Sequence, residues 1–338
     1  MVKEIELEEY LQSDGGYVLL DTRTPAEYEK AHMAGANNLP LLDNEERAII
    51  GTTFKQVGRE EAILQGFDLT GHKWRSFIEQ ALEFAPNKKV AVYCWRGGMR
   101  SGIMSWILDL YGFDVVKIKK GYKGFRNWVL DQFEKDYNII VLGGMTGSHK
   151  TEVLMEFKTM GEQIIDLEGL AKHCGSSYGT MNIKVQPTQE EFENQMAYEL
   201  YALDANKRIW VEDESRTIGK LVVPQNIFRQ MRENRLIKMD IGREKRIDFL
   251  EEEYGVLDPS FLIEATERIA KRLGPVQTKT AVEAIKNGDM REFISIALDY
   301  YDKAYKRGLS TRDAETIDII SIEFENSNQC AKYILEKL

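Results

Sequence analysis

Two segments of the chain, Val90–Ser101 and Tyr137–Thr151, share one order of features: an apolar strand, a glycine-rich turn and the start of a helix. Turns of this kind point backbone N–H groups inward, and with the helix N-terminus they form a cradle for an anion. Strands that alternate with helices are typical of a parallel sheet with helices on its faces. The repeated pattern therefore predicts an α/β protein with two anion-binding loops.

In the first segment, Cys94 stands directly after the strand, in the sequence VAVYCWRGGMRS. Gly97 and Gly98 allow positive φ, while Arg96 and Arg100 add positive potential. Both effects favour the thiolate of Cys94 and make it a better nucleophile at neutral pH. We therefore predict that Cys94, Arg96 and Arg100 are catalytic and that Gly97 and Gly98 bind a phosphate group.

The motif by itself does not select the reaction. Cysteine phosphatases and sulfurtransferases share the spacing Cys-x5-Arg. A cysteine at a strand end is also often a small core residue, but that interpretation leaves the two arginines and two glycines unexplained.

Residues upstream of this loop resemble the rhodanese pattern. The matching residues are Asp21-Thr22-Arg23, Glu27-Tyr28, the run AHMAGA at 31–36 and Asn38-Leu39-Pro40. Ala31 and Ala34 stand where that pattern has Gly and Pro. The resemblance implies a rhodanese-like domain, in which we expect Asp21 and Arg23 to support the Cys94 loop. A structural ion pair beneath the loop is an equally good interpretation of these two residues.

The second segment resembles a P-loop. Its sequence GMTGSHKT, Gly144–Thr151, matches G-x4-G-K-[ST] except that His149 replaces the last glycine. Histidine enters the left-handed region more often than most residues, so we expect the cradle to survive. The predicted phosphate-binding residues are Gly144, Thr146, Gly147, Ser148, Lys150 and Thr151. Thr151 is also a candidate ligand for Mg²⁺, whereas nucleotide hydrolysis is not expected.

Carboxylates are expected to face the P-loop from a neighbouring strand. The apolar run Arg208–Val211 precedes Glu212, Asp213 and Arg216, which we predict to be supporting residues. The alternative for the segment 144–151 is a plain glycine-rich turn followed by a solvated helix.

The strand and helix signals divide the 338 residues into two domains. We place a rhodanese-like parallel-sheet domain at residues 1–135. A P-loop NTPase-like α/β domain follows at 136–338, with a helical C-terminal extension from about 243. Expected strands are Tyr17–Asp21, Val90–Tyr93, Val115–Ile118, Tyr137–Leu142, Ile164–Leu167, Arg208–Val211 and Ile317–Ile322. Expected helices in the first domain are Pro25–Ala31, Ser101–Tyr111 and roughly 125–135.

Composition and spacing exclude several classes of protein. No run approaches the roughly 20 apolar residues of a membrane span, and the charged N-terminus lacks a secretory apolar stretch, so we expect a cytoplasmic protein. The three cysteines and four histidines do not stand at metal-ligand spacing, so no zinc or other metal centre is expected. Cys174 is expected to be a small packed residue.

A net charge of −10 argues against a sequence-blind nucleic-acid binder but leaves room for a local basic patch. The stretch Lys117–Arg126, followed by Trp128, interleaves lysines with Tyr122 and Phe125. It is either a surface that stacks on RNA bases or a solvated loop beside Cys94.

A rhodanese-like domain followed by a P-loop domain, over nearly the whole chain, resembles the tRNA 2-selenouridine synthase family. Further matching blocks are Asn44–Ala48, Gly51-Thr52, Lys55-Gln56, Gly58, Asp166–Ala171, His173, Gly175-Ser176, Phe192–Asn194, Glu212–Arg216, Ile218-Gly219, Tyr300–Asp302 and Tyr305. His149 and a shorter, weakly matching C-terminal region depart from the family.

The resemblance implies an enzyme that replaces sulfur by selenium in the wobble 2-thiouridine of tRNA, after geranyl diphosphate has alkylated that sulfur. Selenophosphate is the implied selenium donor. We expect a monomer without a tightly bound cofactor, with Mg²⁺ as a candidate accessory ion. The diphosphate is assigned to the P-loop, and selenophosphate to the Cys94 loop with Arg96 and Arg100.

Two other functions are compatible with the motifs. One is a cysteine phosphatase or rhodanese-type sulfurtransferase with a nucleotide-binding regulatory domain, although Tyr93 replaces the His that commonly precedes a phosphatase cysteine. The other is a non-enzymatic P-loop adaptor that binds RNA and uses the rhodanese fold as an interaction module.

Overall fold

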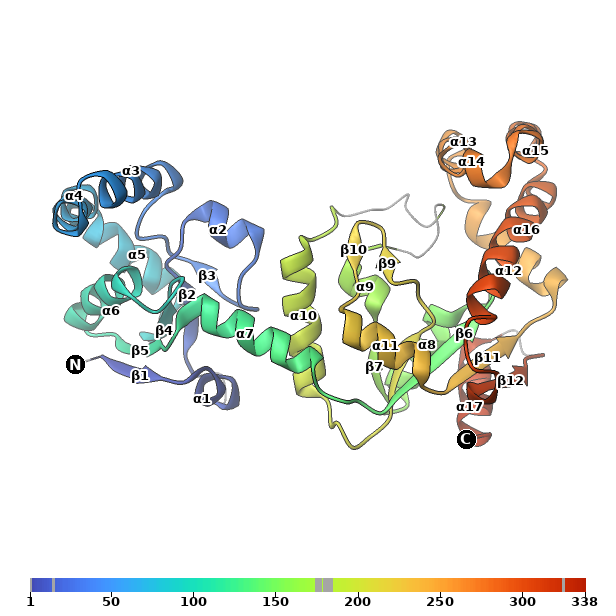
Figure 1. Ribbon diagram of the computed structural model, residues 1–338, viewed down its shortest axis with the longest axis horizontal. Helices are drawn as coiled ribbons and strands as arrows, with labels where there is room; N and C mark the ends of the chain where they lie inside the picture. Colours follow the sequence, from blue (N-terminus) through green and yellow to red (C-terminus); the bar gives the residue numbers. More distant parts are fainter. Residues whose placement is uncertain (1, 14–15, 174–177, 179–184, 324–325) are drawn as a thin grey trace. The chain divides into compact units, whose positions relative to one another are not determined.

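The computed structural model describes residues 2–13, 16–173, 178, 185–323 and 326–338. The chain forms two compact units, Met1–Gln132 with Glu193–Tyr198, and Phe133–Phe192 with Glu199–Leu338 (Figure 1). Each unit contains a parallel sheet with helices, so the predicted α/β class is confirmed. None of the described helices is both long and apolar enough to cross a bilayer.

The sheet of the first unit has the order β1-β5-β4-β2-β3, with every pair parallel. Its strands are β1 (Lys3–Ile5), β2 (Val18–Asp21), β3 (Asn37–Asn38), β4 (Lys89–Tyr93) and β5 (Asp114–Ile118). The helices are α1 (Leu7–Gln12), α2 (Pro25–Lys30), α3 (Asn44–Gln56), α4 (Arg59–Thr70), α5 (Trp74–Phe84), α6 (Met99–Tyr111) and α7 (Gly121–Phe133), with a 3₁₀ turn at Gly71–Lys73.

Burial explains the central position of β4. Its residues Val90–Tyr93 are fully buried, as expected of a parallel strand covered on both faces. On one face, Val90 and Val92 pack against Phe77 of α5 and Met104 of α6. This packing places the carboxyl end of β4, and therefore Cys94, at the edge of a rigid core.

Between β3 and β4 the chain forms three helices, α3, α4 and α5. The sequence patterns predicted no element in this segment. Helix α3 begins with a capping box in which the Asp43 side chain accepts from the Glu46 N–H and Glu46 accepts in return. The apolar positions of α3 are only half-buried or exposed, so its hydrophobic periodicity is weak.

The sheet of the second unit has the order β12-β11-β6-β8-β7, again all parallel. Its strands are β6 (Ile139–Gly144), β7 (Gln163–Ile165), β8 (Ile209–Glu212), β11 (Leu236–Asp240) and β12 (Ile317–Ser321), and a separate hairpin joins β9 (Thr217–Ile218) to β10 (Leu221–Val222). The helices outside the helical part are α8 (Lys150–Thr159), α9 (Leu167–Ala171), α10 (Gln189–Ala202), α11 (Gln225–Glu233) and α17 (Ser327–Glu336), with a 3₁₀ turn at Ala314–Thr316.

The helical part predicted from about 243 lies between β11 and β12. It consists of α12 (Arg243–Tyr254), α13 (Pro259–Arg268), α14 (Ala270–Leu273), α15 (Pro275–Asn287) and α16 (Met290–Leu309), which share a core of their own (Figure 1). The chain then returns to the sheet, because β12 pairs with β11. The predicted last strand is present as β12, and α17 follows it.

Candidate active site

The Cys94 loop is held in place by the start of α7. The N–H of Tyr122 donates to the Cys94 carbonyl at 2.8 Å, and the N–H of Lys123 donates to the Trp95 carbonyl at 2.9 Å. Gly121 has a φ of 52°, and a Cβ there would lie 2.1 Å from the Cys94 carbonyl oxygen. Only glycine fits this approach, so residues 27 positions apart in the sequence define one loop conformation.

The Cys94 side chain is only 3% exposed, and its Sγ lies 3.2 Å from the Ser101 hydroxyl. Burial opposes ionisation of the thiol. The Ser101 hydroxyl, the backbone N–H groups of Ser101 and Arg96, and the charge of Arg100 outweigh it, and the pKa of Cys94 falls below its usual value. The loop therefore favours a thiolate, as the sequence predicted.

The two arginines of the loop differ in their surroundings. Arg96 is exposed. Arg100 donates two hydrogen bonds to the Glu27 carboxylate, at 2.5 and 3.3 Å. Burial opposes ionisation of Glu27, but Arg100 holds its pKa below the usual value. The ion pair fixes Arg100 beside the loop and leaves Arg96 as the more accessible cation.

Gly97 and Gly98 complete the turn. Gly97 has a φ of 66°, and a Cβ there would lie 3.0 Å from the Ile118 carbonyl oxygen. Gly98 caps the N-terminus of α6. Both residues therefore occupy the backbone positions at which an anion would be received.

Asp21 and Arg23 form a buried ion pair in the first unit, at 2.6 Å. Arg23 also donates to the Ala31 carbonyl, and its guanidinium lies 3.7 Å from the ring centroid of Tyr122. The Tyr93 hydroxyl donates to Asp21 at 2.8 Å. The pair therefore has a structural role, because it connects β2 to β4 through Tyr93 and to α7 through Tyr122.

The hypothesis that aromatic residues near Lys117–Arg126 stack on RNA bases is wrong. Tyr122 and Phe125 are completely buried and Trp128 is 7% exposed, because all three belong to the core of the first unit. Bases cannot reach side chains that the protein interior already covers. Lys117 and Lys119 form ion pairs with Glu4 and Glu6.

The P-loop has the predicted strand–turn–helix form. It follows β6, and α8 begins at Lys150. His149 has φ 54° and ψ 36°, so it does adopt the left-handed conformation, and its ring packs on Phe249 at a centroid distance of 4.3 Å. A Cβ on Gly144 would lie 2.5 Å from the Ser148 hydroxyl. The backbone path of the cradle is retained without the last glycine.

Helix α12 of the helical part contacts the P-loop. Arg246 of α12 donates to the Thr146 carbonyl at 3.1 Å and forms a buried ion pair with Asp302 of α16 at 2.8 Å. A Cβ on Gly147 would lie 3.0 Å from the Arg246 carbonyl oxygen. Asp302 belongs to the family block Tyr300–Asp302, which by itself indicates no role for this residue.

A cluster of three carboxylates lies beside the P-loop. Glu168, Glu212 and Glu214 each place an oxygen within 4.8 Å of the others. Glu212 ends β8, which pairs with β6. Burial raises the pKa of Glu212 to about 7, against the opposing charge of Lys150. Burial and the charge of Glu168 raise the pKa of Glu214 as well.

Two polar atoms at this site are buried and have no hydrogen-bond partner among the described residues. They are one carboxylate oxygen of Glu212 and the hydroxyl of Ser148. Buried polar atoms are normally satisfied, so these two indicate a missing ligand. Three carboxylates next to Thr151 provide the hard oxygen ligands that Mg²⁺ prefers, so the residues present fit that ion.

The other two predicted supporting residues lie elsewhere. Asp213 forms ion pairs with Arg312 at 2.7 Å and Arg232 at 3.5 Å. Arg216 is exposed in the turn before β9. The structure therefore brings Glu212 to the P-loop but not Asp213 or Arg216, and adds Glu168 and Glu214. Cys174 lies outside the described residues.

Comparison with known proteins yields two family matches. Residues 5–128 match the rhodanese-like domain, and residues 137–260 match the tRNA 2-selenouridine synthase AAA domain. Among curated proteins, tRNA 2-selenouridine synthase of Nitrosomonas europaea is 33% identical over 95% of this chain and 85% of its own length. The synthases of Nitrosomonas eutropha (36%; 79% and 70%) and a Sulfurovum species (35%; 84% and 83%) are similarly close.

Proposed function

The chain belongs to the tRNA 2-selenouridine synthase family, and we propose that it converts wobble 2-thiouridine of tRNA to 2-selenouridine through a geranylated intermediate. The observation that carries this proposal is the pairing of a thiolate-favouring loop at Cys94 with an anion cradle at Lys150 in one chain. A monomer is the proposed active form. The proposed compartment is the cytoplasm.

The first step transfers the geranyl group from its diphosphate to the sulfur of 2-thiouridine. A carbon–sulfur bond forms, the carbon–oxygen bond to the diphosphate breaks, and the diphosphate leaves with the bonding electron pair. We assign the diphosphate to the P-loop. Lys150 has no ion-pair partner among the described residues, and the Ser148 hydroxyl is buried without an acceptor. Gly144, Gly147 and Thr151 complete the cradle, which stabilises negative charge on the leaving group.

Glu168, Glu212 and Glu214 would hold Mg²⁺ beside this cradle, with Thr151 as a further oxygen ligand. The ion would neutralise charge on the diphosphate. Burial, together with the negative charge of the neighbouring carboxylates, raises the pKa values of Glu212 and Glu214, and a bound cation would offset both effects.

The second step belongs to the Cys94 loop, where Cys94 acts as the nucleophile: its thiolate attacks C2 of the uridine as the C2–sulfur bond breaks, and selenide from selenophosphate then displaces the Cys94 sulfur from C2. In the net reaction, the bond from C2 of uridine to selenium forms, the C2–sulfur bond breaks, and geranylthiol leaves. Water takes the phosphoryl group of selenophosphate, so no oxidant or reductant is needed. Arg96 and the turn at Gly97 and Gly98 receive selenophosphate, and Arg100 is oriented by Glu27.

Nucleoside mass spectrometry tests the proposal most directly. The protein is incubated with 2-thiouridine tRNA, geranyl diphosphate and selenophosphate, and the digested nucleosides are analysed over time. We expect S-geranyl-2-thiouridine to rise first and 2-selenouridine to replace it. Hydrolysis of an aryl phosphate with no change in the nucleosides would instead support the phosphatase alternative.

A further inference from the structure

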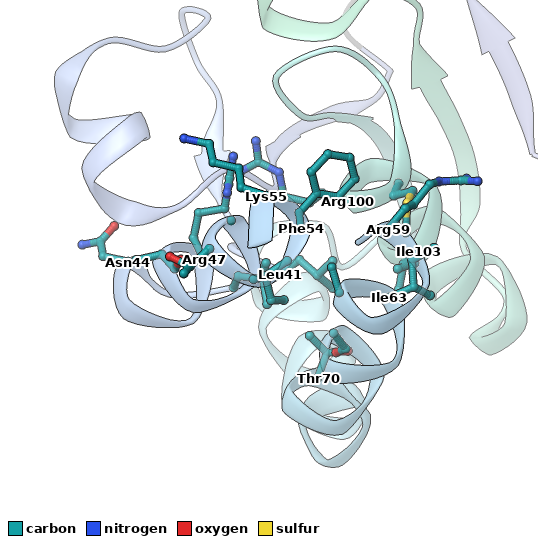
Figure 2. Close-up of a pocket in the computed structure, with 18 residues that line it drawn as sticks. Leu41, Asn44, Arg47, Phe54, Lys55, Arg59, Ile63, Thr70, Arg100 and Ile103 are labelled. Carbon is teal, nitrogen blue, oxygen red and sulfur yellow. The ribbon is translucent and has the colours of Figure 1, made fainter. Parts of the chain in front are cut away.

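The first unit contains a cavity that the proposed function has not used. Helices α3 and α4 and the first turns of α6 enclose about 710 Å³ (Figure 2). Pockets for small molecules usually measure about 300 to 1,000 Å³, so this one is large enough for a ligand. The family blocks Asn44–Ala48, Gly51-Thr52 and Lys55-Gln56 fall on α3, which forms one wall.

The cavity is apolar inside and cationic at its edge. Leu41, Leu42 and Ala62 are buried at its base. Figure 2 shows the basic side chains Arg47, Lys55, Arg59 and Arg100 on one side of the cavity, and Leu41, Ile63 and Thr70 on the opposite side.

All charged residues that line the cavity are basic. No acidic residue is among those that line the cavity, and Arg47, Lys55 and Arg59 form no ion pair within the described part of the chain. An apolar interior next to unpaired cations is complementary to an apolar chain attached to a polyanion.

The cavity adjoins the Cys94 loop. Met99 and Arg100 line it, and the next residue, Ser101, places its hydroxyl 3.2 Å from the Cys94 Sγ. A second apolar depression, between α4 and α6, shares Ile103 with the cavity and extends it toward Trp106. The cavity therefore lies next to the loop that carries Cys94.

We propose that the cavity binds the geranyl chain of S-geranyl-2-thiouridine in tRNA while the Cys94 loop exchanges sulfur for selenium. This inference rests on the proposed function and names the group that the second step recognises. Arg47, Lys55 and Arg59 contact backbone phosphates of the same tRNA. The geranyl chain anchors the nucleoside, and geranylthiol leaves from a site that already accommodates it. Unmodified 2-thiouridine lacks this anchor and is rejected.

Gly66→Leu is the variant that tests the cavity. Gly66 lies in α4 and lines the cavity, and a Cβ there would meet only the Ile50 side chain, at an ordinary 3.6 Å. Leucine also favours a helix more than glycine does, so the variant should fold. Gly308→Leu in α16 is the matched control, because a Cβ at that helical glycine meets nothing within 4 Å.

The measurement uses tRNA that already carries an S-geranyl or a shorter S-dimethylallyl group, with selenophosphate. Gly66→Leu should lower kcat/KM for the S-geranyl tRNA by roughly 10²-fold, and that for the S-dimethylallyl tRNA by no more than about threefold. Geranylation of 2-thiouridine tRNA should be unchanged. Ile63→Ala widens the cavity and should improve conversion of an S-farnesyl tRNA.

Three results would overturn the inference. An equal loss of kcat/KM for the S-geranyl and S-dimethylallyl tRNAs would show that the cavity does not bind the prenyl chain. Loss of geranylation alone would show that it holds free geranyl diphosphate instead. Unchanged kinetics in a folded Gly66→Leu variant would show that it is not used. Failure of the unmodified protein to convert S-geranyl tRNA at all would contradict the proposed function itself, which distinguishes the two cases.

Discussion

The Cys94 loop and the P-loop are both strand–turn–helix segments at the carboxyl end of a central parallel strand. The pKa values of the acidic side chains beside the two loops are nevertheless shifted in opposite directions. Around Cys94, a hydroxyl, two backbone N–H groups and an arginine lower the pKa of the thiol. Around the P-loop, burial and mutual repulsion raise the pKa values of Glu212 and Glu214. The first loop thus favours the thiolate form of Cys94.

Beside the P-loop, the ionised form of the acidic side chains is disfavoured. Burial disfavours the ionised form of these carboxylates, and among the described residues Lys150 forms no ion pair and the Ser148 hydroxyl forms no hydrogen bond. In the proposed function, one local architecture therefore presents a reactive thiol in one unit and binds phosphate and metal in the other. The experiments below test that contrast.

Replacing Cys94 by Ala should abolish formation of 2-selenouridine, by about 10³-fold or more, because the only thiolate of the loop is lost. Geranylation of 2-thiouridine tRNA should continue. Both products are measured by nucleoside mass spectrometry, with Cys330→Ala in α17 as the control. Persistent selenation in Cys94→Ala would show that the thiol has no role in this step.

Replacing Lys150 by Met should have the complementary effect. Loss of one positively charged contact to the leaving diphosphate should slow geranylation by about 10²- to 10³-fold. Selenation of tRNA that is already geranylated should be unchanged. Lys158→Met, in the last turn of the same helix, is the control. If both steps slowed equally, the division of labour between the loops would be wrong.

Glu212 should make the protein less stable as pH rises. Its pKa is about 7 in the folded state, above the ordinary value of 4.5. The unfolded chain therefore releases this proton first, and stability falls between pH 4.5 and 7 by about 3 kcal/mol at most. Glu212→Gln should flatten this part of the profile of melting temperature against pH.

The same variant tests the cation site. At pH 8, Mg²⁺ should raise the melting temperature of the unmodified protein, because it binds ionised carboxylates, and should have little effect on Glu212→Gln. An equal response of both proteins to Mg²⁺ would place the ion elsewhere.

Ser101→Ala should give the smallest effect. Without the hydroxyl at 3.2 Å, the pKa of Cys94 rises, and alkylation of the thiol by iodoacetamide at pH 7 should slow about tenfold. The Cys94 peptide is followed by mass spectrometry over a range of pH. Ser105→Ala is a matched control, since Ser105 is buried in the same helix and its hydroxyl has no hydrogen-bond partner among the described residues.

The extent to which sequence alone is informative differs between the parts of the site. The strands before both loops are recognisable because they are short, apolar and followed at once by glycines. The left-handed conformation of His149 was expected from its position in the P-loop pattern and is confirmed. By contrast, helices α3 and α4 carry few buried apolar residues, so periodicity does not reveal them or the cavity between them.

Charged residues are the hardest to assign from sequence. Glu212 and Asp213 are neighbours, but successive residues of an extended chain point in opposite directions, so Glu212 lies at the P-loop and Asp213 pairs with Arg312. Glu168 joins Glu212 from a different strand–helix connection. No spacing rule connects the two residues, because their proximity depends on how the sheet is ordered.

The sequence by itself determined the family, the two α/β units and the two loops, because a strand–turn–helix motif is specified by residues that are close together in the chain. Tertiary packing determines which distant charges meet and where the cavity forms. The Arg100–Glu27 pair, the carboxylate cluster and the cavity beside Cys94 all join residues from separate elements. Such contacts arise from packing, and burial then sets the pKa values that give the two loops their different chemistry.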